Sequence, residues 1–191
     1  KGLPCDTIIV NNSTDNKEFV SFLKKYNNKK TKNGIIKVIK GNNIGVSFGG
    51  YNLAFQKLKY KYQNYWMFAE DDFTWTFENY FKDGVDIFNS KKEIGFVCMV
   101  GLTSRGRLQP VGDIVDVPRH CDGGMGITHY DCLTEVCDIN GELPYYKYQP
   151  DIVDKTNQVI KGEIPFTNIY HSSLSMDIVS ITDKLLNNRV Q

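Results

Sequence analysis

The stretch most able to do chemistry is a run of bulky apolar residues that stops at three acids. Residues 65–69 read Tyr-Trp-Met-Phe-Ala, and Glu70, Asp71 and Asp72 follow directly. Carboxylates side by side repel one another unless a cation relieves the repulsion. Hard divalent cations prefer such oxygen ligands, and Mg²⁺ commonly shares them with substrate phosphates. We therefore expect this stretch to hold a metal ion that carries a diphosphate.

The apolar run itself predicts the element that positions these acids. An unbroken run too short for a core helix is typical of a strand buried on both faces, as in a parallel sheet. Ligands of open parallel sheets bind beyond the carboxyl ends of the strands, which is where the three acids lie. The alternative is that Asp71 or Asp72 only caps a helix beginning near Thr74.

Strand and helix patterns alternate over the first hundred residues. Strands are expected at 7–10, 35–39, 65–68 and 94–100. Helices are expected at 17–28, from the segment 48–52 to about residue 60, and at 77–88. Ser13, Thr14 or Asp15 is expected to cap the first helix. This alternation predicts βαβ units and an α/β fold with a mainly parallel central sheet flanked by helices.

The pattern changes after Gly101, where the chain becomes irregular. We expect an edge strand or hairpin at 115–117, a short strand at 125–128, a helix at 130–137 and a loop at 140–161 with clustered tyrosines. A helix from 162 to 170 and a strand or helix at 178–186 complete the chain. Long loops in compact domains are often functional.

Composition narrows the class of protein. The formal net charge is +1, which gives no overall electrostatic footprint for nucleic acid or an anionic membrane. No apolar stretch reaches the length of a membrane span. Five irregularly spaced cysteines do not make a disulfide framework, so a reducing, cytoplasmic setting is expected. The lysine-rich segment 24–32 is either a solvated helix end or a basic docking patch.

Three motifs, in order, resemble a known family. They are Val10-Asn11-Asn12-Ser13-Thr14-Asp15, then Asn43-Ile44-Gly45 with Gly49-Gly50-Tyr51-Asn52, then Phe68-Ala69-Glu70-Asp71-Asp72. Together they resemble the nucleotide-sugar-binding half of GT-A glycosyltransferases, especially the family 2-like group. The chain departs from that pattern in three ways. The family's first strand is absent before Lys1, Asn11 stands where an Asp often contacts uracil after a slightly shortened turn, and Glu70 begins the metal motif.

The resemblance implies a single GT-A (Rossmann-like) domain over 1–191, with a nucleotide-sugar-binding half at 1–100 and an acceptor-binding half at 101–191. It implies metal-dependent transfer from a UDP-sugar to a glycan or other hydroxyl acceptor, with inversion. Mn²⁺ or Mg²⁺ would be held by Asp72, Glu70 and His171. Glu163 or Asp122 would be the general base. The nucleotide-sugar contacts implied are Asn11, Asp15, Asn43, Gly45, Asn52, Glu70 and Asp71.

Structural roles compete with each of these assignments. Gly45, Gly49 and Gly50 fit a turn before a helix, Glu163 fits the positive end of a helix, and His171 fits a structural histidine. Arg105, Arg107 and Arg119 are candidates for diphosphate or an anionic acceptor, or are simply exposed. A zinc site is conceivable at His120, Cys121, His129, Cys132 and Cys137, although no CxxC pair is present. A nucleotidyltransferase and a non-catalytic nucleotide-sugar or glycan-binding module remain as alternative functions.

Overall fold

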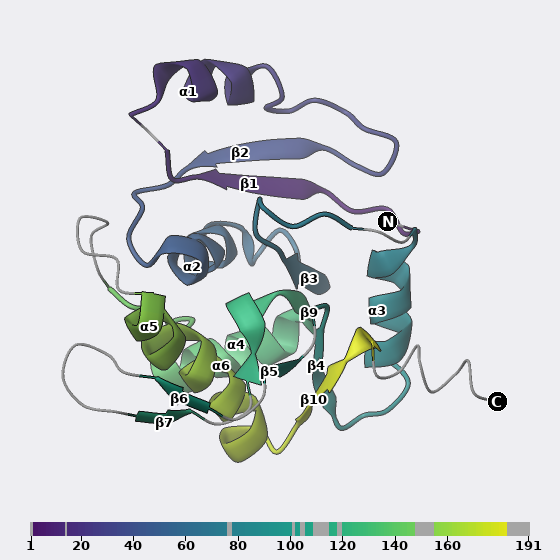
Figure 1. Cartoon of the computed structure of the whole chain (residues 1–191). Coiled ribbons are helices and arrows are strands. Elements are labelled where there is room, and N and C mark those ends of the chain that lie inside the picture. The colour runs from purple at the N-terminus through teal and green to yellow at the C-terminus, as the bar shows by residue number, and fades with distance from the viewer. Residues whose placement is uncertain are drawn as a thin grey trace.

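A parallel pair of strands opens the fold. The structure is a computed structural model, and it describes residues 2–13, 15–75, 78–100, 102–103, 106–108, 115–117, 120–147 and 155–182. Strand β1 (Thr7–Asn11) pairs in parallel with β2 (Ile36–Lys40). Helix α1 (Lys17–Lys24) connects them on the outside of the molecule (Figure 1). The expected cap is corrected, because the side chain of Asn16 accepts from Phe19 N at 3.0 Å and occupies the N-cap position.

The main sheet has four strands in the order β10-β4-β9-β3. They are β3 (Tyr65–Phe68), β4 (Ile94–Cys98), β9 (Gly126–His129) and β10 (Asp177–Ser180). Strand β10 is parallel to β4, but β9 runs antiparallel to both β3 and β4. The α/β class is confirmed, whereas the expectation of a mainly parallel sheet is wrong for this sheet. Burial on both faces makes a strand apolar throughout, whichever way its neighbours run.

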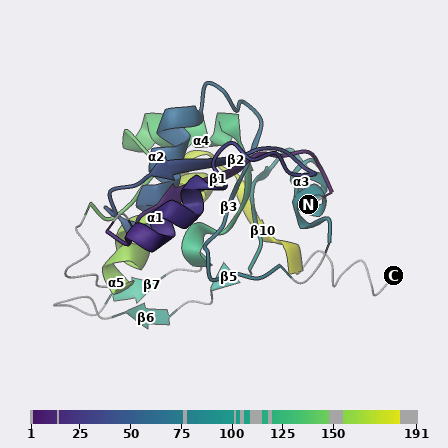
Figure 2. The same ribbon diagram turned by 90° about the horizontal axis from the view of Figure 1, so that it is seen from above.

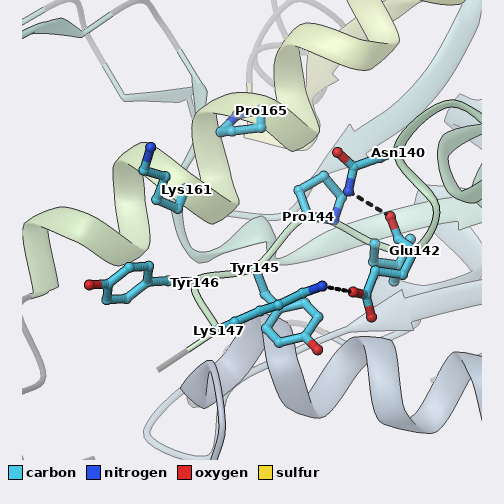
Figure 3. Close-up of a pocket in the computed structure, with 9 residues that line it drawn as sticks. Asn140, Glu142, Pro144, Tyr145, Tyr146, Lys147, Lys161 and Pro165 are labelled. Carbon is cyan, nitrogen blue, oxygen red and sulfur yellow. Dashed lines mark hydrogen bonds and ion pairs between the residues drawn. The ribbon is translucent and has the colours of Figure 1, made fainter. Parts of the chain in front are cut away.

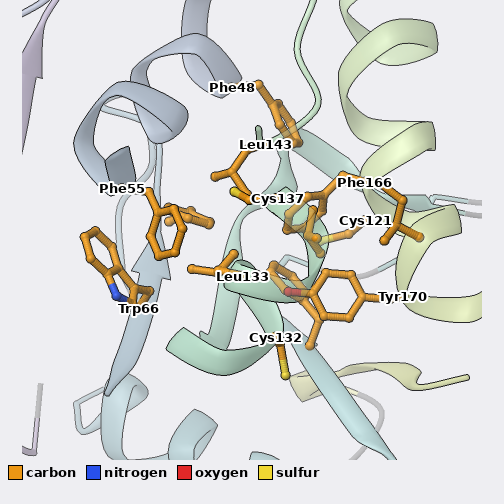
Figure 4. Close-up of a cluster of buried hydrophobic side chains, with 14 of the residues drawn as sticks. Phe48, Phe55, Trp66, Cys121, Cys132, Leu133, Cys137, Leu143, Phe166 and Tyr170 are labelled. Atoms are coloured by element: carbon orange, nitrogen blue, oxygen red, sulfur yellow. The ribbon is translucent and has the colours of Figure 1, made fainter. Parts of the chain in front are cut away.

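Helices cover both faces of the main sheet. They are α2 (Val46–Leu58), α3 (Tyr80–Phe88), α4 (Tyr130–Asn140) and a helical stretch made of α5 (Lys155–Gln158), η3 (Val159–Glu163), α6 (Ile164–Asn168) and η4 (Ile169–Ser173). Side chains from α2, α4, α6 and η4 contribute to the larger core, in which Phe55, Leu133 and Tyr170 are fully buried (Figure 4). Helix α3 packs on the other face through Phe81 and Val85.

The described part of the connection between β4 and β9 contains four short strands. Strand β5 (Leu102–Thr103) pairs with β8 (His120–Cys121), and β6 (Gly106–Leu108) pairs with β7 (Val115–Val117), which confirms the expected hairpin. No disulfide joins the five cysteines, all of which lie in the described part of the chain. Among the described residues, no helix is both long enough and apolar enough to cross a membrane.

Candidate functional site

The three acids follow β3 directly, as expected. Glu70 is half-buried, and its Oε1 accepts a 2.5 Å hydrogen bond from the hydroxyl of Ser47 in the first turn of α2. Asp71 and Asp72 are exposed in a turn. The N-cap of the next helix, α3, is Asn79. Asp71 and Asp72 therefore do not cap that helix, so helix capping does not explain why three acids follow β3.

The direction of β9 brings the second half of the chain to the acids. Phe68 at the end of β3 is in register with Gly126 at the start of β9, so the residues before β9 lie beside the residues after β3. This places the 3₁₀ turn η1 (Asp122–Gly124) against Glu70. Gly123 has a φ of 60°, and a Cβ on it would lie 3.4 Å from Glu70 Oε1. A larger residue would be strained there and would crowd the carboxylate.

A buried acid approaches the same place from η3. Glu163 ends this π-helical turn with 8% of its surface exposed, and its Oε2 lies 3.4 Å from Nε2 of the buried His120 on β8. Two contacts hold these elements in place. The backbone N–H of Cys121 donates to Thr167 Oγ1 at 3.2 Å, and Gly162 packs against the ring of Phe48. π-Helical turns inside α-helices are frequent at functional sites.

The electrostatics show that the acids share one environment. Burial raises the pKa of Glu70, the hydrogen bond from Ser47 opposes this rise, and the charges of Asp72, Glu163 and Asp122 add to it. Burial, followed by the charge of Glu70, raises the pKa of Tyr51 well above its ordinary value. The charges of carboxylates from three separate segments thus act on Glu70 at this edge of the sheet.

Two buried polar atoms at this edge have no hydrogen-bond partner. In the described part of the chain, the buried side-chain atoms without a hydrogen-bond partner are Tyr51 Oη and Glu163 Oε2. The contact of Glu163 with His120 is within ion-pair distance but does not supply a hydrogen bond to Oε2. Buried polar groups are nearly always satisfied, so each exception calls for an explanation such as a ligand or an ordered water.

Several predicted nucleotide contacts lie in the turns after β1 and β2. Asn11 is buried, and its Oδ1 accepts from Ser13 N at 3.0 Å. Asp15 is exposed in the turn before α1. Asn43 has a φ of 54°, and its N–H donates to Asn12 Oδ1 at 3.2 Å. The two turns are thus hydrogen-bonded to each other at the carboxyl end of β1 and β2.

Gly45 and Asn52 have clear structural roles. Gly45 is the N-cap of α2 with a φ of 74°, and a Cβ there would lie 2.3 Å from Cδ2 of Tyr145. Asn52 is buried, donates to Glu142 Oε2 at 2.7 Å and accepts from Leu143 N at 3.1 Å. These contacts favour the turn-shaping alternative for Gly45 and bind α2 to the loop after α4.

The predicted metal ligands are only partly brought together. Asp72 and Glu70 share the end of β3, whereas His171 is exposed on η4. No group of three or more His, Cys, Asp or Glu side chains suited to a metal ion occurs within the described ranges. This finding also covers the conceivable zinc set, in which His129 instead caps α4 by accepting from Asp131 N. The carboxylate oxygens of Asp72 and Glu70 are of the ligand type that Mg²⁺ and Mn²⁺ prefer.

Some residues predicted to bind an anion lie outside the described residues. Other residues of the site are not marked by any sequence motif. Arg105 and Arg119 are outside the described residues, and only the backbone of Arg107 is described. No motif marks Ser47, although its place in the first turn after the Gly45 bend was an available clue. His120 is grouped by sequence only with a zinc set, because its partner Glu163 is 43 residues away.

A pocket of about 380 Å³ opens at the loop after α4, between this loop and the helical stretch of η3 and α6. Figure 3 shows Lys161 of η3 and Pro165 of α6 on one side and Tyr145 with Lys147 on the other. Lys147 pairs with Glu142 at 2.6 Å. The pocket is lined by Asn140, Glu142, Leu143, Pro144, Tyr145, Tyr146, Lys147, Lys161 and Pro165. The tyrosine cluster expected in this loop thus contributes to a concave surface, with Tyr148 outside the described residues.

Comparisons with protein-family models, with curated proteins and with solved structures found no match to this chain.

Proposed function

We propose that this protein is a metal-dependent glycosyltransferase that moves a sugar from a nucleotide sugar, with UDP favoured, to a hydroxyl group of a glycan or other acceptor. The observation that carries this proposal is the pair of unsatisfied buried atoms, Tyr51 Oη and Glu163 Oε2, beside the acids that end β3. A hydroxyl-rich ligand would satisfy both atoms. The three sequence motifs and their order support the choice of a sugar nucleotide over other ligands.

Glu163 is the proposed general base. Its Oε2 would accept the proton of the acceptor hydroxyl as that oxygen attacks the anomeric carbon, opposite the departing diphosphate. Burial keeps water away from this carboxylate, and His120 at 3.4 Å limits its orientation. Asp122, which is exposed on η1, remains the second candidate. Single displacement from the face opposite the leaving group gives inversion.

The donor's diphosphate is proposed to lie between the end of β3 and the start of α2. Helix α2 has no side-chain cap and no acid in its first turn, so its free N–H groups suit an anion. Asp72 and Glu70 would hold Mg²⁺ or Mn²⁺, which when bound neutralises charge on the leaving diphosphate. Ser47 would keep Glu70 oriented toward this position.

The decisive test is release of UDP from a panel of UDP-sugars, each with a mixed set of glycan acceptors and Mn²⁺ or Mg²⁺. We expect turnover with at least one donor, loss of turnover when the metal is chelated, and loss in Asp72→Ala. Tight UDP binding without turnover of any donor would instead indicate a binding module. Turnover of nucleoside triphosphates to release pyrophosphate would indicate a nucleotidyltransferase. Either result would refute the proposal.

A further inference from the structure

Helix α1 leaves an aromatic edge uncovered. Leu23 is its one residue buried against the body of the protein, whereas Phe19 is 38% exposed and Phe22 is 49% exposed. The two rings are stacked with centroids 6.4 Å apart, and Phe22 lies 4.9 Å from the ring of Tyr26. A continuous apolar edge of this kind, rather than a single exposed side chain, calls for a partner.

Lysines surround this edge. Between residues 17 and 32 the chain carries one acid, Glu18, and six exposed lysines, namely Lys17, Lys24, Lys25, Lys29, Lys30 and Lys32. The ammonium of Lys29 lies 4.9 Å from the centre of the Tyr26 ring. The formal net charge of +1 for the whole chain therefore hides a strongly basic region at one end of the fold.

The position of α1 makes this region available. Figure 1 shows the helix at the periphery, on the side of β1 and β2 that faces away from α2. In Figure 2, seen from above, α1 lies in the foreground of the view, alongside the two strands. The lysine pair Lys91 and Lys92 belongs to a different region, in the exposed connection between α3 and β4.

From these observations we infer that α1 and the segment after it, residues 17–32, form a docking surface for an anionic lipid bilayer. Lysines are attracted to the negative headgroups, and the exposed rings enter the boundary between headgroups and acyl chains. The inference does not depend on the proposed function. It replaces the expectation, based on net charge alone, that an anionic membrane is not a partner.

A bilayer fits this surface better than a nucleic acid does. The ring faces of Phe19, Phe22 and Tyr26 are turned partly toward one another, which leaves less open face for stacking bases. The region contains lysine but no arginine, the residue best suited to bidentate phosphate recognition. Diffuse attraction by lysines combined with apolar insertion is instead the pattern of a peripheral membrane surface.

Sedimentation of the full chain with lipid vesicles tests the inference. We expect binding to vesicles that are roughly one third phosphatidylserine, little binding to phosphatidylcholine alone, and weakening as salt is raised. Lys24→Gln with Lys25→Gln should weaken binding by more than roughly tenfold, since each lysine near a surface contributes about fivefold. Phe22→Gln should weaken vesicle binding by at least about threefold, because the variant has no ring to transfer from water into the bilayer.

Lys91→Gln with Lys92→Gln is the matched control, because it removes the same charge elsewhere. Circular dichroism and thermal melts establish that every variant is folded. Equal losses in the control pair and the Lys24 and Lys25 pair would overturn the inference. So would unchanged vesicle binding in Phe22→Gln, binding to single-stranded RNA but not to vesicles, or a dimer in light scattering that Phe22→Gln converts to a monomer.

Discussion

The imidazole Nε2 of His120 lies 3.4 Å from Oε2 of Glu163, and both side chains are at least nine-tenths buried. The pair joins β8 to the π-helical turn η3, two elements that are far apart in the sequence. Its position next to the acids after β3 is what makes Glu163 a stronger candidate base than the sequence alone suggested. The predictions below begin with this pair.

Glu163→Gln keeps the shape of the side chain but removes its ability to take a proton. If Glu163 is the base, we expect kcat for sugar transfer to fall by about 10²- to 10⁴-fold while the KM for the donor changes little. His120→Asn should lower kcat less, because His120 only positions the carboxylate. Steady-state kinetics on both variants provide the measurement. A rise in donor KM with unchanged kcat would assign Glu163 to ground-state binding instead.

Asp72 and Asp71 are adjacent exposed acids that make a matched pair. We expect Asp72→Asn to weaken Mn²⁺-dependent UDP binding by at least about tenfold, since one ligand charge at the metal is lost. Asp71→Asn should have a smaller effect. Isothermal titration with and without Mn²⁺ separates the two. Identical metal-dependent affinities for the wild type and Asp72→Asn would refute the assignment of Asp72 as a ligand.

Asn52 should prove to be structural rather than a nucleotide contact. Asn52→Ala leaves the buried N–H of Leu143 without its acceptor and takes a partner from Glu142, so we expect a loss of about 1–3 kcal/mol in unfolding free energy. UDP affinity should be unchanged in the protein that remains folded. Urea denaturation and UDP titration measure the two effects. An affinity loss without a stability loss would restore Asn52 to the binding site.

Asp6 provides a pH-dependent test of how β1 is held. The hydrogen bond from the Tyr62 hydroxyl at 2.5 Å, then that from Ile35 N at 2.8 Å, lowers the pKa of Asp6 below 3.8. A lowered carboxyl pKa stabilises the fold above the unfolded value, and this stabilisation is lost as the pH falls through the folded value.

Tyr62→Phe should therefore be less stable than the wild type at neutral pH, by about 1 kcal/mol because Asp6 is partly exposed. The difference should shrink at pH values below 3.8, where Asp6 becomes protonated. Urea denaturation across this range measures it. A difference that stayed constant with pH would show that the Tyr62 hydroxyl contributes to stability independently of the charge on Asp6.

Local patterns in the sequence were sufficient to predict most elements of the first hundred residues. Apolar runs placed β1, β2, β3 and β4, and helical spacing placed α1, α2 and α3 to within a few residues. The terminal segment that the pattern left open begins with the strand β10. These elements follow from which side chains must be buried, and burial is visible along the chain.

Local sequence patterns could not predict the direction of each strand or the contacts between residues that are distant in the sequence. The sequence predicts a short strand at 125–128, close to the observed β9, but nothing local indicates that it inserts between β3 and β4 in the opposite sense. The site depends on that insertion, because it brings Asp122 and His120 toward Glu70. Contacts such as Asn52 with Glu142 likewise join residues whose approach is decided by the packing of α2 on the second half.

The connection between β4 and β9 has a closed base, since the N–H of Met99 donates to the carbonyl of Met125 at 2.9 Å. Within it β5 pairs with β8, so the segment between these two strands departs and returns at one place. Lengthening such a segment is inexpensive in free energy, because closure entropy grows only slowly with loop size. Insertions between β5 and β8 would therefore leave the frame that holds the acids unchanged.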